Sequence, residues 1–194
     1  MNLNPKIESS SVNCYSPMAV YDLSNYMFDT FIQSKVFDYD QVVILCIGSD
    51  RSTGDSLGPL VGYKLKSMLF KHKEVVLLGT LDEPVHAKNL EEKIEYIYAN
   101  FSNPFILAID ASLGQFDKIG FINIRKGPLK PGLGVNKILP TIGHVSITGV
   151  VNASGIMEYV VLQNTRLNLV MRMAEVISKS IHLCMIKYKK IKSN

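Results

Sequence analysis

Short apolar runs that alternate with helical segments place the strongest constraint on the fold of this chain. Two of them, residues 42–47 and 105–109, have the length and composition of buried parallel strands. Each is followed by an aspartate in a loop-forming sequence, Asp55 after the first run and Asp110 after the second. In open α/β sheets, ligands and chemistry collect beyond the carboxyl ends of such strands. The two aspartates are therefore the first candidates for a functional site.

The wider pattern predicts an α/β fold. Strands that alternate with helices favour a parallel sheet wound by right-handed crossovers. We expect three layers, with a mostly parallel, twisted sheet and helices on both of its faces. The expected strands are residues 42–47, 74–79 and 105–109, and the expected helices are about 17–37, 57–71, 87–99 and 163–186.

Organisation along the chain indicates one domain. A length of 194 residues fits a single domain with a sizeable core, and no interdomain linker is recognisable. We expect a flexible N-terminal segment over residues 1–16 and a single α/β domain over 17–194. A further β segment at 120–125 precedes a stretch rich in glycine and proline, 127–134, which breaks regular structure. The run 145–151 is ambiguous between a strand and the start of a helix.

Composition excludes several classes of protein. An apolar fraction of 47% with 20% charged residues is not that of a disordered chain. No apolar run approaches the ~18 residues of a membrane span, and the N-terminus lacks a secretory signal, so we expect a cytoplasmic protein with no membrane partner. Three cysteines without a CxxC pair predict neither a zinc knuckle nor a disulfide framework. The net charge of +4 comes largely from the tail, residues 187–192, and no nucleic-acid partner is expected.

The loop that contains Asp55 precedes a helix, and proline restricts where that helix starts. Either Ser56 is the N-cap with Pro59 at the third position, or Gly58 is the N-cap with Pro59 at the first. In both cases Asp55 is free to face the site; the alternative is that Asp55 itself caps the helix. The glycine spacing fits neither a P-loop nor a dinucleotide fingerprint, and Asp50 with Asp55 would repel a phosphate.

Other polar residues are expected at the same edge of the sheet. Glu83 and His86 follow the strand at 74–79, and Asp50 lies in the Asp55 loop. His86 could act as a general acid or base or as a metal ligand, although a lone histidine more often packs or caps a helix. His144 follows the stretch rich in glycine and proline, which could let it reach the site.

Asp110 is the stronger acid candidate of the pair. An aspartate directly after five apolar strand residues is partly removed from water, which raises its pKa, and a neighbouring carboxylate raises it further. Such a pair can share one proton and polarise a carbonyl and a water together. The alternative is a structural aspartate bonded to loop amides.

These segments resemble a known family. Residues 48–62 and 108–114, with 79–90 and 148–167, are similar to the YyaC-type sporulation proteins of spore-forming bacteria, over about residues 40–180. These proteins are described as spore proteases by similarity to the germination protease. Asp55 in Thr-Gly-Asp-Ser-Leu-Gly-Pro and Asp110 in Ile-Asp-Ala-Ser match the two aspartate contexts of that protease.

The resemblance implies a phosphorylase/hydrolase-like fold and a cytoplasmic peptidase of the developing spore. It implies Asp55 and Asp110 as catalytic residues, and a peptide or protein substrate such as the small spore proteins. By the likeness to the germination protease, no cofactor is expected. The hydrogenase maturation endopeptidases, which share the fold, add a histidine and recognise nickel; by that likeness nickel or zinc could bind Asp55, Asp110 and His144. A third hypothesis is a non-catalytic spore-assembly or regulatory protein that retains the fold.

Overall fold

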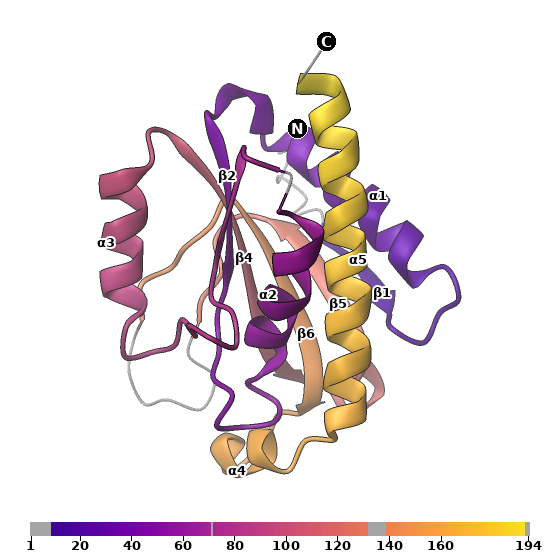
Figure 1. Cartoon of the computed structure of the whole chain (residues 1–194). Coiled ribbons are helices and arrows are strands. Elements are labelled where there is room, and N and C mark those ends of the chain that lie inside the picture. The colour runs from indigo at the N-terminus through magenta and orange to yellow at the C-terminus, as the bar shows by residue number, and fades with distance from the viewer. Residues whose placement is uncertain (1–8, 71, 132–138, 193–194) are drawn as a thin grey trace, which may run out of the picture.

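The computed structural model describes residues 9–70, 72–131 and 139–192. Within them, strands and helices alternate as the sequence predicts (Figure 1). The strands are β1 (Ser9–Asn13), β2 (Gln41–Cys46), β3 (Val75–Leu78), β4 (Pro104–Gly114), β5 (Phe121–Lys126) and β6 (Val145–Ala153). The helices are α1 (Ala19–Gln33), α2 (Leu57–Met68), α3 (Leu90–Asn100), α4 (Glu158–Gln163) and α5 (Leu167–Lys192), with 3-10 turns η1 (Val36–Asp38) and η2 (Phe116–Lys118).

The described strands form one sheet in the order β1-β5-β6-β4-β2-β3. The pairs β2–β3, β2–β4 and β4–β6 are parallel, whereas β5 runs antiparallel to both β1 and β6. β2 is therefore flanked by β3 and β4, the neighbours that the sequence analysis assumed. The carboxyl ends of β3, β2, β4 and β6 all lie at one edge of the sheet.

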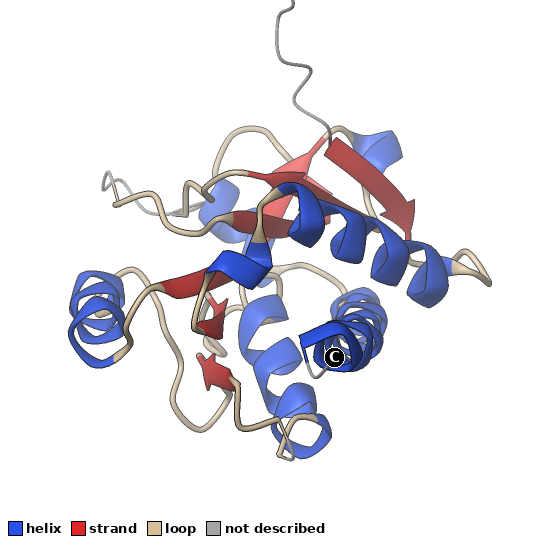
Figure 2. Ribbon diagram, turned by 90° about the horizontal axis from the view of Figure 1, so that it is seen from above, coloured by secondary structure: helices blue, strands red, loops and turns tan. Residues whose placement is uncertain are grey.

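Helices cover both faces of this sheet, which confirms the predicted α/β class. The side chains of Val42, Ile44 and Cys46 pack in one core with α1, α2 and α5. The alternate side chains Val43 and Leu45 pack in a second core with α3. Burial on both faces explains why β2 is apolar throughout rather than alternating. Figure 1 shows α3 apart from α1, α2 and α5, and Figure 2 shows helices around the strands when the molecule is viewed from above.

The expectation of a flexible segment over residues 1–16 is wrong for its second half. Residues 9–13 form β1, an edge strand that pairs antiparallel with β5, and the rest of that segment, 1–8, lies outside the described residues. Val12 is buried while Ser9 and Ser11 are exposed. An edge strand with one apolar position offers little hydrophobic signal, so its polar sequence reads as a loop.

Several boundaries differ from the predicted ones. The expected helix at 163–186 corresponds to α5, which begins at Leu167 and runs to Lys192, and the short helix α4 before it was not expected. The ambiguous run 145–151 is part of β6. Part of the stretch 127–134 falls outside the described residues. Among the described residues, no helix combines the length and apolarity that a membrane crossing requires.

Candidate functional site

The loop between β2 and α2 is closed tightly over the end of β2. Gly48 has φ of 141°, its N–H donates to the Val85 carbonyl at 2.8 Å, and the Ser49 N–H donates to the Asp55 carbonyl at 3.1 Å. A Cβ on Gly48 would lie 2.0 Å from that Asp55 carbonyl oxygen. Only glycine fits there, and its absence of a side chain lets the loop carry Asp55 back to the strand end.

Asp55 does not cap α2. The N-cap is Ser56, whose hydroxyl donates to the Thr53 carbonyl at 2.7 Å, and Pro59 is the third helical residue. This is the first of the two placements that the proline allowed, and it leaves the Asp55 carboxylate available. Burial raises the pKa of Asp55 to about 6, although the Ser49 N–H and the nearby His86 both favour the ionised form.

Asp110 lies inside β4 rather than in a loop after it, contrary to the prediction. β4 continues to Gly114 and pairs there with β6, whereas β2 has already ended at Cys46. The Ile47 N–H donates to the Ile109 carbonyl at 2.7 Å, just before Asp110. Asp110 is therefore a strand residue whose neighbour on the β2 side has turned away.

The Asp110 side chain is buried, with 5% of its surface exposed, and its Oδ1 accepts a hydrogen bond from the Ala111 N–H at 2.7 Å. Burial raises the pKa of Asp110 well above its ordinary value, and the negative charge of Asp55 raises it further. The two carboxyl groups are thus within electrostatic reach of each other at the carboxyl edge of the sheet. The arrangement favours one ionised and one protonated carboxyl group.

His86 lies beside this pair. It follows Val85, which bridges to Ile47, and its N–H donates to the Asn89 side chain at 2.8 Å. The His86 Nδ1 is buried and has no hydrogen-bond partner among the described residues. A positive charge on this ring favours ionised Asp55. His86 can therefore influence which of the two carboxyl groups holds the proton.

Asp50 and Glu83 flank the pair without joining it. Both are exposed, Asp50 in the β2–α2 loop and Glu83 in the loop after β3. The Glu83 N–H donates to the Thr80 hydroxyl at 3.3 Å. They are solvent-accessible residues of two different loops, unlike the buried Asp110.

The structure does not bring His144 to the aspartates, which corrects that part of the prediction. His144 directly precedes β6, at the opposite edge of the sheet, and its Nδ1 accepts the Ile106 N–H at 2.9 Å. Its ring stacks on Phe105 and contacts Tyr39, with ring centroids 5.3 and 4.8 Å away. Burial lowers the pKa of this imidazole, which keeps it a neutral acceptor. His144 is a structural residue.

A nickel or zinc site fits poorly at this edge. The described residues contain no group of three or more histidine, cysteine, aspartate or glutamate side chains placed to hold a metal ion. Of the three predicted metal ligands, His144 is not available, because its Nδ1 accepts the Ile106 N–H. Two carboxylates, with His86 near one of them, fall short of the four ligands typical of zinc.

Sequence reasoning missed an apolar rim next to the Asp55 loop. Ile156, Met157 and Tyr159 are 91%, 67% and 58% exposed, and they lie in and just before α4. The Gly54 N–H donates to the Leu162 carbonyl at 2.8 Å, which fixes α4 to the loop. The signal was Gly155 followed by two large apolar residues, a composition unusual for an exposed turn.

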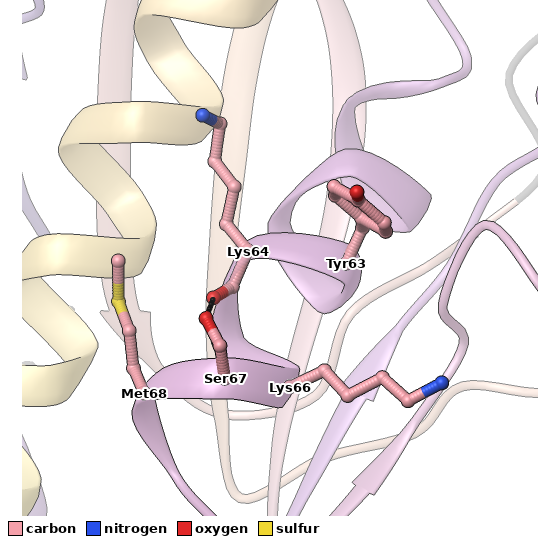
Figure 3. Close-up of a pocket in the computed structure, with 5 residues that line it drawn as sticks. All are labelled: Tyr63, Lys64, Lys66, Ser67 and Met68. Carbon is pink, nitrogen blue, oxygen red and sulfur yellow. Dashed lines mark hydrogen bonds between the residues drawn. The ribbon is translucent and has the colours of Figure 1, made fainter.

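A separate cavity lies on the outer surface of α2. It encloses about 400 Å³ and is lined by Tyr63, Lys64, Lys66, Ser67 and Met68, none of them a predicted site residue. Figure 3 shows Lys64 and Met68 extending toward α5 and Lys66 extending the other way. Lys64 forms an ion pair with Glu175 of α5 at 3.0 Å. The charged side chains that line this cavity are lysines, so it differs chemically from the edge of the sheet that holds the two aspartates.

Comparison with known proteins identifies the family. Residues 11–180 match a family model described as a protein of unknown function, DUF1256. The chain belongs to this family. It is 56% identical to the uncharacterized protein YyaC of Bacillus subtilis (strain 168) over 142 residues, which are 73% of this chain and 68% of that protein.

A solved structure shows the same fold. The [NiFe] hydrogenase maturation protease HycI from Thermococcus kodakarensis KOD1 superposes with a TM-score of 0.53 and 19% identity. The match covers 82% of this chain and 99% of HycI. The two proteins therefore share an α/β fold.

Proposed function

We propose that this protein is a peptidase in which Asp55 and Asp110 hydrolyse a peptide bond together. The observation that carries the proposal is the buried Asp110 carboxyl, whose pKa is raised by burial and by the charge of Asp55. Two carboxyl groups with different environments at one strand edge are the arrangement that acid-pair hydrolysis requires. The fold shared with a maturation protease supports the same class of reaction.

The different burial of the two groups assigns their roles. Asp55, with a pKa of about 6, is ionised at neutral pH and takes a proton from water as the general base. Asp110 stays protonated and donates a hydrogen bond to the oxygen of the scissile carbonyl. The hydroxide formed at Asp55 bonds to the carbonyl carbon, and the carbonyl π electrons move to the oxygen.

Collapse of this tetrahedral intermediate completes the reaction. The C–N bond breaks as Asp55 returns its proton to the leaving nitrogen, and a carboxylic acid and an amine are released. His86 lies beside Asp55, and a proton on its ring favours the ionised form of that carboxyl group. His86 is thus a positioning residue in this scheme.

We also propose a role in sporulation. The support is the 56% identity to YyaC of a spore-forming bacterium and the germination-protease-like context of both aspartates. The substrate is then a protein of the developing spore, of which the small spore proteins are the first candidates, and the protein acts in the cytoplasm of that cell.

A non-catalytic binding role is the second candidate. The exposed rim of Ile156, Met157 and Tyr159 favours it, because apolar patches of this kind commonly contact another protein. In this case the aspartates are structural, and the edge of the sheet holds a partner peptide without cleaving it.

The test compares wild type with Asp110→Asn. Asparagine keeps the volume and the Oδ1 that accepts the Ala111 N–H, but it cannot donate an acidic proton. Each protein is incubated with extracted small spore proteins, and new N-termini are identified by mass spectrometry. We expect new N-termini with wild type, none with Asp110→Asn, and melting temperatures within ~3 °C of each other.

Controls make this result specific. Asp29→Asn, at an exposed position of α1, should cleave as wild type does. The rate should rise with pH through about 6, as Asp55 ionises. Equal cleavage by Asp110→Asn would remove the acid pair from the chemistry. No cleavage by wild type, together with binding of an intact spore protein, would favour the non-catalytic role.

A further inference from the structure

The strand β3 forms an open edge of the sheet. It is the last strand in the order of the described chain, and it pairs on one side with β2. The Val42 N–H donates to the Glu74 carbonyl at 3.1 Å, so the main chain of Glu74 faces β2. Main-chain groups alternate in direction along a strand, and those of Val75 and Leu77 therefore face outward. The Val75 N–H donates to the His72 carbonyl at 3.0 Å, whereas Leu77 turns its N–H and its C=O to the side of β3 where no described strand lies.

A cavity of about 480 Å³ runs beside this edge. Its walls include Val75 and Leu77 from β3 and Leu69 and Phe70, which directly follow α2. Val75 and Leu77 point to the same face of the sheet, where both pack against the main core. Phe70 is 74% exposed and forms the outer wall. The cavity is thus a groove parallel to an open strand, apolar at these four residues and polar where Lys66, His72 and Lys73 line it.

The groove leads toward the acid pair. Its lining continues past the end of β3 to Thr80, Asp82 and Glu83, in the loop that carries His86. An ion pair between Lys66 and Asp82 at 2.8 Å ties this loop to α2. A bound peptide that follows the groove therefore leaves it at the edge of the sheet where Asp55 and Asp110 lie.

We propose that an extended segment of the substrate binds along β3 as an additional strand, with alternate side chains in this groove. The inference rests on the proposed peptidase function and adds how the substrate is held. An extended peptide is the ligand whose main-chain donors and acceptors match those of Leu77, and apolar side chains match the walls of the groove. A second copy of this chain fits less well, since β3 has four residues and their pairing buries little of the ~1,600 Å² of a typical interface.

The sheet order fixes the distance from this segment to the scissile bond. Asp110 is on β4, and the added strand would lie beyond β3, three strand spacings or about 14 Å to the side. Leu77 is level with Leu107, so Asp110 also lies three residues, or about 10 Å, further along the strands. An extended chain spans the combined distance of about 17 Å in about five residues. We therefore expect the scissile bond about five residues from the anchored segment, and the anchored segment to carry apolar residues at alternate positions.

The experiment separates main-chain recognition from side-chain packing. Phage that display random 12-residue peptides are selected on Asp110→Asn protein, which binds without cleaving, and an enriched peptide is synthesised with a fluorescent label. Its Kd is measured by anisotropy in the Asp110→Asn background, with and without Leu77→Pro or Leu77→Ala. Both substitutions remove the same side chain, but only proline removes the outward N–H.

We expect Leu77→Pro to weaken binding at least tenfold and Leu77→Ala less than threefold, and the bound peptide to slow amide exchange at Leu77. Phe70→Ala, at an exposed wall position, should weaken binding of the peptide severalfold. If thermal melts show that the Leu77→Pro variant is unfolded, the Kd of the Phe70→Ala variant tests the proposal in its place. Equal effects of proline and alanine without slowed exchange, or no enriched peptide, would overturn the proposal. A dimer in sedimentation that Leu77→Pro dissociates would assign the edge to a second copy instead.

The proposed peptidase function and the proposed docking site can fail independently of each other. Wild type that binds the peptide at β3 but leaves it intact retains this docking site and loses the peptidase assignment. Wild type that cleaves the peptide with a rate unaffected by Leu77→Pro retains the peptidase assignment and loses the docking site.

Discussion

Replacing Asp55 by asparagine should stabilise the folded protein at neutral pH. The pKa of Asp55 rises from 3.8 to about 6 on folding, mainly because the carboxyl group is buried. A raised pKa means that the folded protein holds this proton more tightly than the unfolded chain does. Stability is therefore greatest at low pH and is lost as the pH rises between about 4 and 6. An asparagine at this position would carry no charge and would avoid this loss.

The size of the effect follows from the pKa difference. A change from 3.8 to about 6 corresponds to about 3 kcal/mol at pH 7. Partial exposure of Asp55 reduces this to between ~1 and ~3 kcal/mol, or a rise in melting temperature of roughly 3–10 °C for a domain of this size. At pH 4 the same difference falls below ~0.6 kcal/mol.

The assay is urea denaturation of wild type, Asp55→Asn and Asp29→Asn at pH 4, 5, 6, 7 and 8. The stability gain of Asp55→Asn should grow between pH 4 and 7 and then level off, while Asp29→Asn should follow wild type throughout. Asp110, whose pKa is raised in part by Asp55, should ionise more easily in the Asp55→Asn variant. A gain that does not depend on pH, or a loss of stability at pH 7, would refute an ionised and destabilising Asp55.

Two further predictions concern the loop and the metal. Gly48→Ala should lower the free energy of unfolding, measured by urea denaturation, by more than ~2 kcal/mol, because the new Cβ would meet the Asp55 carbonyl. The control is Gly127→Ala, where φ is also positive but nothing lies within 4 Å of the new Cβ, and it should cost about 1 kcal/mol. Equal losses would show that the contact with Asp55 is unimportant. Calorimetric titration with nickel or zinc should give the same weak or absent heat for wild type, His86→Ala and His144→Ala. Stoichiometric binding lost in either variant would restore the metal hypothesis.

The sequence predicts most of the fold because its central strands are buried on both faces. Such strands need unbroken apolar runs, and β2 is therefore recognisable without any tertiary information. The edge strand β1 is not, since Val12 is its one buried position and tertiary pairing with β5 defines it. The short helix α4 is not predicted either, and a tertiary contact, the Gly54 N–H with the Leu162 carbonyl, joins it to the β2–α2 loop.

The candidate site is predictable only where chain direction decides position. Asp55 follows β2, and Asp110 lies in the second half of its parallel neighbour β4, so both come to the carboxyl edge. His144 precedes β6, and the antiparallel strand β5 ends at the amino edge of the sheet, close to where His144 enters β6. Order along the chain does not reveal that reversal, which is why the histidine expected at the acid pair belongs instead to an aromatic cluster.

The unequal lengths of β2 and β4 explain why the two aspartates differ. β2 ends at Cys46, opposite Ile109, while β4 continues beside β6, so Asp110 is held in a strand but lacks a strand neighbour on one side. The glycine-closed loop covers that gap and carries Asp55, which stays partly exposed at the start of α2. The Asp110 carboxyl group is thus deeply buried and that of Asp55 is partly exposed to solvent, and their pKa values differ for that reason. The division into proton donor and general base in the proposed reaction is a consequence of where two neighbouring strands stop.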